Sequence, residues 1–206
     1  MQFIFLVFLV FAINFFIKKK EQRHRIILLG RQLGQYQIEK LMETLADGYL
    51  RALGEADEDR RNQVWRYLDT AEVQFCEQFN KFSAQMMTLD AADTRVSKFA
   101  VGFAMATKIF PKNTFDVREA LAIHARGIEK AAKNEMGRSP RDKAFTLSAE
   151  LFLMQHTCHW FCNSKDIASA RLLMRHKTTY AQVLQAVDAD TRSAYCALTA
   201  ARKPHD

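Results

Sequence analysis

The densest group of reactive side chains in the sequence lies in the segment HTCHWFC, residues 156–162. On a helix, Cys158 and Cys162 are one turn apart on one face, and His159 shares a neighbouring edge with Cys162. Thiolate and imidazole groups are the ligands that zinc prefers. The segment is therefore a candidate metal site, and its four candidate ligands are His156, Cys158, His159 and Cys162.

A structural zinc site needs four ligands, and one helix comfortably presents two of them. The others would have to come from distant positions, among them His124, His176, Cys76 and Cys196. The competing interpretation is that these cysteines are small core side chains, because cysteine is among the most buried residue types. The sequence contains no CxxC redox motif and no CxxCH haem motif. We therefore expect no cofactor, with zinc as the alternative.

Three other titratable side chains fall within apolar helical patterns: His124, His176 and Glu150. A lone histidine on an apolar stripe is more often a hydrogen-bonded core residue than a catalyst. Glu150 lies in a segment that is apolar on most sides, so a buried carboxylate with an Arg or Lys partner is expected there. No glycine-rich nucleotide loop and no paired Glu-x-x-His motif occur. These patterns favour a binding or structural role over catalysis.

The segments that carry these residues have helical periodicity. With seven glycines and three prolines, the chain is poor in backbone breakers. Apolar residues recur every three or four positions over 26–53, 64–82, 96–110, 113–137 and 164–202, and Ser139-Pro140 predicts the start of a helix running to residue 162. No segment away from the N-terminus alternates with the period of a strand. The expected fold class is all-α, with a bundle of about five helices.

The N-terminal residues 3–17 form an apolar run in which Asn14 is the one polar side chain. A helix of this length reaches about 22 Å, against a bilayer core of ~30 Å. The run is short, but the lysines that follow it can extend to the headgroups. A cleaved signal peptide and a buried or interfacial helix are the alternatives. We expect a single transmembrane helix.

A basic cluster follows this run and predicts its orientation. Positive residues stay on the cytoplasmic side, so the N-terminus should face outward from the cell membrane and the rest of the chain should be cytoplasmic. The same cluster should attract anionic lipid headgroups. It consists of Lys18, Lys19, Lys20, Arg23 and Arg25.

One face of the apolar run is a candidate contact with another membrane helix. It comprises Ile4, Phe8, Phe11 and Phe15, which follow one another at helical spacing. A simple lipid-facing role is the competing interpretation, because phenylalanine is also a favourable residue in lipid.

The formal net charge of +7 is concentrated near the N-terminus. Residues 1–53 hold eight basic and four acidic side chains, so more than half of the excess lies beside the apolar run. Binding to phosphate backbones depends on accumulated positive charge. A nucleic-acid partner is therefore not expected for the nearly neutral remainder.

The sequence thus predicts a membrane anchor over 1–20, a juxtamembrane amphipathic helix over 21–53 and a cytoplasmic helical bundle over 54–206. The favoured function is an accessory subunit or assembly scaffold that presents the bundle to other membrane-protein subunits. The alternative is a membrane-tethered metal-binding protein or enzyme centred on residues 156–162. A lipid-surface sensor acting through the lysine triplet is a third hypothesis.

Overall fold

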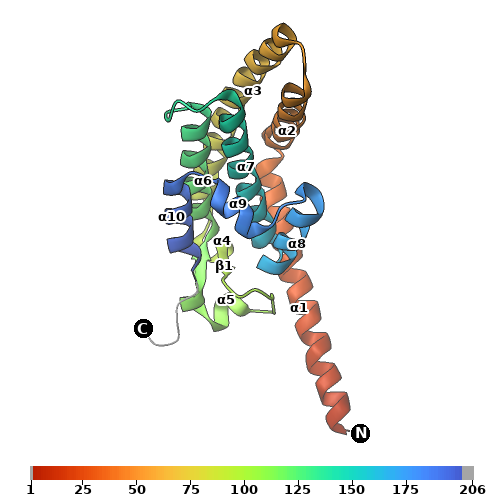
Figure 1. Ribbon diagram of the computed structural model, residues 1–206. Helices are drawn as coiled ribbons and strands as arrows, with labels where there is room; N and C mark the ends of the chain where they lie inside the picture. The colour runs from red at the N-terminus through yellow and green to blue at the C-terminus, as the bar shows by residue number, and fades with distance from the viewer. Residues whose placement is uncertain (1, 201–206) are drawn as a thin grey trace.

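The computed structural model describes residues 2–200, with side chains from residue 4 onward, and this part of the chain is almost entirely helical (Figure 1). The expected all-α fold class is confirmed. In chain order the elements are α1 (Gln2–Leu33), α2 (Ile38–Gly54), α3 (Glu58–Met87), α4 (Ala91–Thr94), β1 (Arg95–Ser97), α5 (Ala106–Ile109), the 3-10 turn η1 (Pro111–Asn113), β2 (Thr114–Asp116), α6 (Val117–Ala132), α7 (Pro140–Cys162), α8 (Lys165–His176), α9 (Tyr180–Ala186) and α10 (Ala189–Thr199).

Helix starts follow from capping side chains. The predicted start of α7 is confirmed, because Ser139 Oγ accepts a hydrogen bond from the Asp142 amide at 3.2 Å and Pro140 takes the first helical position. Asp57 caps α3 in the same way, through the amide of Arg60. Thr179 and Gln182 form a reciprocal capping box at the start of α9. Local side chains therefore satisfy the free amides that open these helices.

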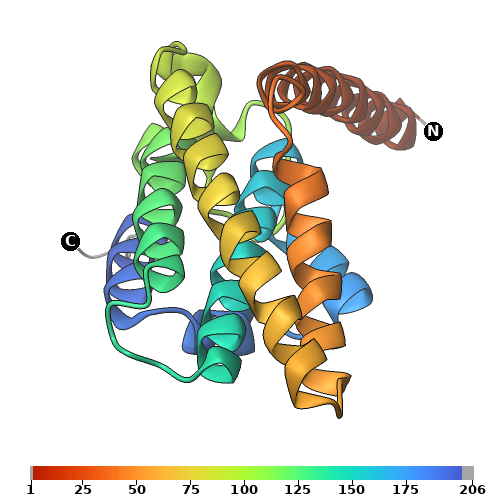
Figure 2. The ribbon, with the colours of Figure 1, turned by 90° about the horizontal axis from the view of Figure 1, so that it is seen from above.

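The bundle is built around α7, which contacts α1, α2, α6, α8 and α9. Seen from above, α3 lies between α2 and α6 (Figure 2). A row of rings on α3 fills the space beneath these helices, with Phe75 and Phe79 stacked at 5.8 Å and Phe82 tilted against Phe79 at 5.7 Å. Aromatic and aliphatic burial of this kind is the main stabilising contribution to the fold.

The prediction of a helix over residues 96–110 is wrong. Val96 instead lies in a short antiparallel pair, opposite Phe115, with β1 and β2 joined in the register Arg95↔Asp116 and Ser97↔Thr114. Tertiary contacts favour the strand, because Trp160 packs edge-on against Phe115 at 4.9 Å and donates to the Ser97 carbonyl at 3.0 Å. The helical spacing of the phenylalanines in this segment reflects a small ring cluster on a loop instead of a helix face.

The helix expected over residues 26–53 is divided in two. The chain leaves helical geometry after Leu33, and α2 starts at Ile38. Tyr36, in the connection, donates its hydroxyl to Gln85 on α3 at 2.5 Å, which fixes the turn against the bundle. The second half then packs as α2 against α3 and α7.

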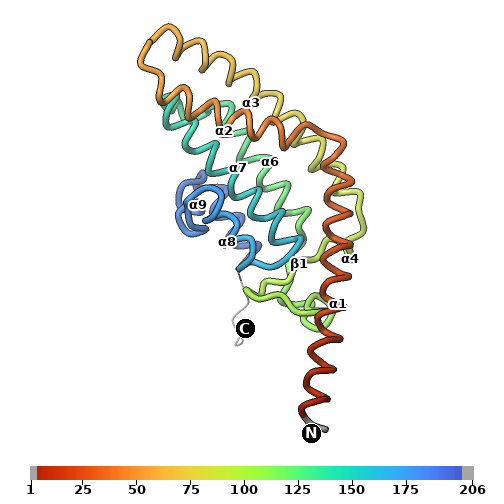
Figure 3. The backbone as a smooth tube through the Cα atoms, turned by 90° about the vertical axis from the view of Figure 1, so that its right-hand side faces the viewer, coloured from red at the N-terminus to blue at the C-terminus, as the bar shows by residue number. Residues whose placement is uncertain are grey.

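The first helix is continuous across the lysine triplet, from Gln2 to Leu33. Its second half lies against α3 and α7, whereas its first half extends beyond the bundle (Figures 1 and 3). In the part of the chain that the structure describes, no helix is long and apolar enough to cross a membrane. The predicted transmembrane span is therefore not supported, because the apolar stretch ends at Lys18.

Candidate functional site: a groove along α7

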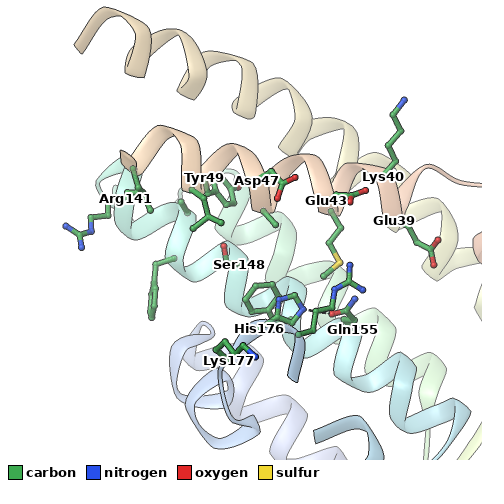
Figure 4. Close-up of a pocket in the computed structure, with 18 residues that line it drawn as sticks. Glu39, Lys40, Glu43, Asp47, Tyr49, Arg141, Ser148, Gln155, His176 and Lys177 are labelled. Carbon is green, nitrogen blue, oxygen red and sulfur yellow. Dashed lines mark hydrogen bonds between the residues drawn. The ribbon is translucent and has the colours of Figure 1, made fainter. Parts of the chain in front are cut away.

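A groove of about 1040 Å³ runs between α2 and α7 and is closed at one end by the last turn of α8 (Figure 4). Its floor is the outer face of α7, where Ser148 and Phe152 lie one turn apart. Phe145, also on this face, is 66% exposed, although the sequence of this helix is apolar on most sides. α7 is central, but this one face is open to solvent.

The α2 side of the groove is mainly acidic, although Lys40 also lines it, and the opposite side is basic. Along α2, Glu39, Glu43 and Asp47 recur every four residues and line the same side. On the opposite side, Arg175 and Lys177 come from the end of α8. Figure 4 shows Lys177 across the groove from Asp47. The arrangement suits an amphipathic peptide. Its apolar side chains would be buried on the floor of the groove, and its charged side chains would form ion pairs with the two sides.

His176, at the end of α8, contacts two residues of α7, Phe152 and Gln155. Its ring stacks on Phe152 at 3.8 Å, and its Nε2–H donates to Gln155 Oε1 at 2.7 Å. Burial lowers the pKa of His176, and the neighbouring Arg175 lowers it further. Gln155 therefore holds the His176 ring against Phe152 on the floor of the groove.

A second hollow of about 750 Å³ continues the groove between α7 and α9. Four residues line both hollows: Phe145, Ser148, Phe152 and His176. On the far side, Val183 and Ala186 of α9 add apolar lining. The open face of α7 is thus flanked on both sides by recesses that side chains of a partner can enter.

The sequence did not identify the groove, although two local signals were present. Glu39, Glu43 and Asp47 repeat at one turn of a helix, and α7 carries apolar residues on nearly all its sides. What the sequence could not supply was the pairing of α2 with residues 175–177, which are about 130 positions away.

Three of the four residues of the predicted metal site contact different neighbours. His156 stacks on Tyr180 at 4.5 Å, with its Nε2 3.1 Å from Ser169 Oγ. His159 Nδ1 lies 3.2 Å from the guanidinium of Arg171. The Cys158 thiol contacts Met154 Sδ at 3.9 Å. No group of three or more His, Cys, Asp or Glu side chains within residues 2–200 is arranged to hold a metal ion.

The electrostatic environment of the two cysteines favours the neutral thiol, whereas that of His156 favours the neutral imidazole. Burial raises the pKa of Cys158 to about 12 and that of Cys162 to about 11, so both thiols are protonated at neutral pH. Burial lowers the pKa of His156 to about 3. Metal binding needs deprotonated thiols, and these surroundings favour the neutral thiol.

The other histidine of the core belongs to a buried hydrogen-bond chain between α6, α7 and α10. His124 Nε2 and the Tyr195 hydroxyl each lie 2.9 Å from Thr157 Oγ1, which itself donates to the Leu153 carbonyl at 3.0 Å. Burial lowers the pKa of His124 to about 3. This closed chain is a structural feature of the bundle interior.

Glu150 is fully buried, as the sequence predicted, but its direct partner differs. Its Oε1 accepts from the backbone amide of Asp188 at 3.0 Å instead of pairing with a basic side chain. Lys130 and Arg138 pair with Asp188 itself, at 2.9 and 3.2 Å. Burial raises the pKa of Glu150 to about 7.

The predicted membrane-facing residues divide into two groups. The proposed helix face is exposed, with Ile4, Phe8 and Phe11 at 61%, 70% and 69%. Phe15 is 49% exposed and lies under the ammonium group of Lys19. Lys20 and Arg23 are exposed and Lys18 is half-buried.

Arg25 contacts the bundle. Its guanidinium donates to the carbonyls of Phe161 and Arg95, both at 3.2 Å. Burial lowers its pKa. Arg25 therefore fastens the second half of α1 to the bundle.

Comparisons with known proteins give no assignment: no protein family, no curated protein and no solved structure matches this chain.

Proposed function

We propose that this protein is a membrane-attached accessory protein that binds a partner through the α7 groove. The apolar first half of α1 inserts into a lipid bilayer, with its N-terminus directed away from the cytoplasm. The bundle lies on the cytoplasmic side and binds an amphipathic helix of a membrane-protein subunit. Residues 18–20 contact anionic headgroups.

The observation that carries this proposal is the exposure of α1 beyond the bundle. Apolar side chains from Ile4 to Phe16 are exposed on all sides of the helix, with Phe5 and Phe16 both at 71%. Exposing so many large apolar side chains to water is unfavourable, and patches of this kind mark contacts with membranes or proteins. A helix that is apolar all round suits lipid better than a one-sided protein contact.

The groove supports the binding part of the proposal. Leu50 and Leu53 on α2 are 72% and 51% exposed at its edge, next to Phe145. An amphipathic helix could bury its apolar residues against these side chains. Its basic residues would face Glu43 and Asp47, and its acidic residues would face the end of α8.

Liposome flotation tests the attachment. The full-length protein, freed of detergent in the presence of vesicles containing phosphatidylserine, should float with them. The double variant Phe8→Asp/Phe11→Asp should reduce the floating fraction at least tenfold, because each carboxylate in the bilayer core costs roughly 2.5–3.5 kcal/mol. The matched control Tyr67→Asp/Val73→Asp changes two exposed residues of α3 and should float normally. Equal flotation of both double variants would contradict the proposal.

Site-specific photocrosslinking tests the groove. A photoreactive phenylalanine derivative in place of Leu50 should crosslink to one discrete membrane protein in cells. The crosslink should be lost with Phe145→Asp or Arg175→Glu and kept with Lys81→Glu, an exposed residue of α3. The same derivative in place of Val73, which is 57% exposed, is the control position. Equal crosslinking from both positions, or no dependence on Phe145 and Arg175, would contradict a groove-bound partner.

A further inference from the structure

The loop between β1 and η1 is fixed against α1 over two turns of that helix. The side chain of Asn14 accepts a hydrogen bond from the Ala104 amide at 3.0 Å, and both carboxylate oxygens of Glu21 lie 3.2 Å from the Met105 amide. These contacts place the loop beside residues 14–21, at the base of the bundle, where the first half of α1 leaves it (Figures 1 and 3).

The loop is internally ordered. Phe99, Phe103 and Phe110 form a ring cluster with centroids 5.3–6.0 Å apart. Met105 has a φ of 58°, in the left-handed region that residues other than glycine rarely adopt. Because its amide is held by Glu21, α1 itself stabilises this unusual conformation.

The outer surface of the loop is apolar. Val101 is 67% exposed, Ile109 57%, Phe110 45% and Met105 39%. These side chains belong to one short segment that lies next to the exposed half of α1. The two regions thus place exposed apolar side chains beside one another at this end of the molecule.

Positive charge surrounds this surface. Residues 98–113 include three lysines and no acidic residue, and Lys108 and Lys112 are exposed. Lys19 and Lys20 are exposed on the adjoining turn of α1. Apolar side chains with neighbouring lysines are the combination that binds the interface of an anionic bilayer, because the rings and chains enter the headgroup region while the ammonium groups pair with lipid charge.

The level of the loop matches such an interface. Ile4 lies ten residues before Asn14, so it would reach about 15 Å deeper along the helix axis, roughly half the thickness of a hydrocarbon core. A bilayer that receives residues 4–13 therefore meets the loop at its headgroup region.

We infer that the loop over residues 99–110 is a second membrane contact, which inserts Val101, Met105, Ile109 and Phe110 into the interface of an anionic bilayer. This inference rests on the proposed attachment through α1. Two contacts, instead of one, set the tilt of the bundle on the membrane. They direct the α2–α3 turn, at the opposite end of the bundle, away from the lipid (Figure 1).

Quenching of tryptophan fluorescence by brominated lipids tests the loop contact. The full-length variant Ile109→Trp is reconstituted with vesicles of phosphatidylcholine and phosphatidylserine, with or without bromine on the acyl chains near the headgroup. The wild type supplies the background from Trp65 and Trp160. Tyr67→Trp, at a position on α3 that is 64% exposed, is the matched control. We expect at least twofold quenching of the added signal for Ile109→Trp and none for Tyr67→Trp.

The same samples are floated, so that the two proposals can fail separately. A protein that floats without quenching at position 109 would overturn the loop contact and leave the attachment through α1 intact. A protein that does not float would overturn both. Equal quenching of the introduced tryptophans at positions 67 and 109 would show that the bundle has no fixed tilt, which also contradicts the inference.

Discussion

Two regions of this molecule depart from the usual distribution of polar and apolar side chains, and they do so in opposite directions. In the interior between α6, α7 and α10, polar side chains such as His124, Glu150 and Thr157 are completely buried. In the first half of α1, large apolar side chains are exposed on all sides. Hydrogen bonds within the chain hold these interior side chains, although His124 Nδ1 and Glu150 Oε2 have no hydrogen-bond partner among the described residues. The exposed helix differs, because nothing within the described chain covers it.

This difference predicts different consequences of mutation. Changes in the interior should alter the free energy of unfolding, since buried polar groups and close packing leave little tolerance. Changes in the first half of α1 should leave unfolding nearly unchanged and alter where the protein binds. The variants below go from the largest expected change in stability to the smallest, each measured by urea unfolding in mild detergent.

Glu150→Gln should have the largest effect, and the effect should depend on pH. Burial raises the pKa of Glu150 to about 7, above its ordinary value of 4.5, so the folded state binds the proton more tightly than the unfolded state. Stability from this group is present below pH 4.5 and is lost as pH rises toward 7. The free energy of unfolding of the wild type falls by about 3 kcal/mol over this range. Glutamine does not titrate, so the variant does not lose this stability. The variant should therefore match the wild type near pH 4 and exceed it near pH 8.

A difference between wild type and Glu150→Gln that stays constant from pH 4 to pH 8 would contradict this account. His124 and His156 also change with pH, in the opposite direction, because their folded pKa values of about 3 are lowered. Their contribution is common to both proteins and cancels in the difference.

Gly127→Ala should reduce the free energy of unfolding by about 2 kcal/mol through overpacking. A Cβ at this position would overlap the Thr191 hydroxyl and lie 2.6 Å from a carboxylate oxygen of Glu150. Gly30→Ala is the matched control within a helix, since nothing lies within 4 Å of its Cβ position, and it should raise stability by ~0.5–1 kcal/mol. Similar effects of the two substitutions would argue against close contact between α6 and the buried carboxylate.

Tyr195→Phe should reduce stability by about 1 kcal/mol, the usual net contribution of a buried hydrogen bond. The lost bond is the one between the tyrosine hydroxyl and Thr157 Oγ1, at 2.9 Å. Tyr67→Phe, at an exposed position, should have no measurable effect. If the two substitutions proved equivalent, the buried chain would contribute nothing to stability.

Phe5→Ser and Phe8→Ser should each change the free energy of unfolding by less than ~0.5 kcal/mol, as is typical of exposed positions. Both rings are at least 70% exposed. A loss of more than 1 kcal/mol in detergent would mean that these rings pack within the protein, and the contrast between the two regions would disappear.

The sequence predicted those parts of the structure that depend on local signals. Ser139 and Pro140 mark the start of α7, and the apolar surroundings of Glu150 indicate its burial; both are confirmed. The segment around Val96 was not predictable, because a strand partner, Phe115, and a covering ring, Trp160, lie far along the chain. Helical spacing was present there, and tertiary pairing overrode it.

The candidate groove was even less accessible to sequence analysis. The acidic row on α2 is visible as a four-residue repeat, but the opposite side comes from Arg175 and Lys177, and only the fold brings them near Glu43. The predicted metal residues illustrate the converse. His156 and Cys158 are close in sequence, yet His156 stacks on Tyr180 of α9 and the Cys158 thiol contacts Met154 within α7.

The central claim is that lipid covers the exposed half of α1, and labelling from within the bilayer tests it most directly. The full-length protein is reconstituted in vesicles that contain a phospholipid with a photoactivatable diazirine near the end of its acyl chain. The labelled residues are then located by mass spectrometry. The account predicts labels within residues 4–17 and none on α3, α6 or α7. Absence of label from residues 4–17, or equal labelling of the bundle helices, would contradict it.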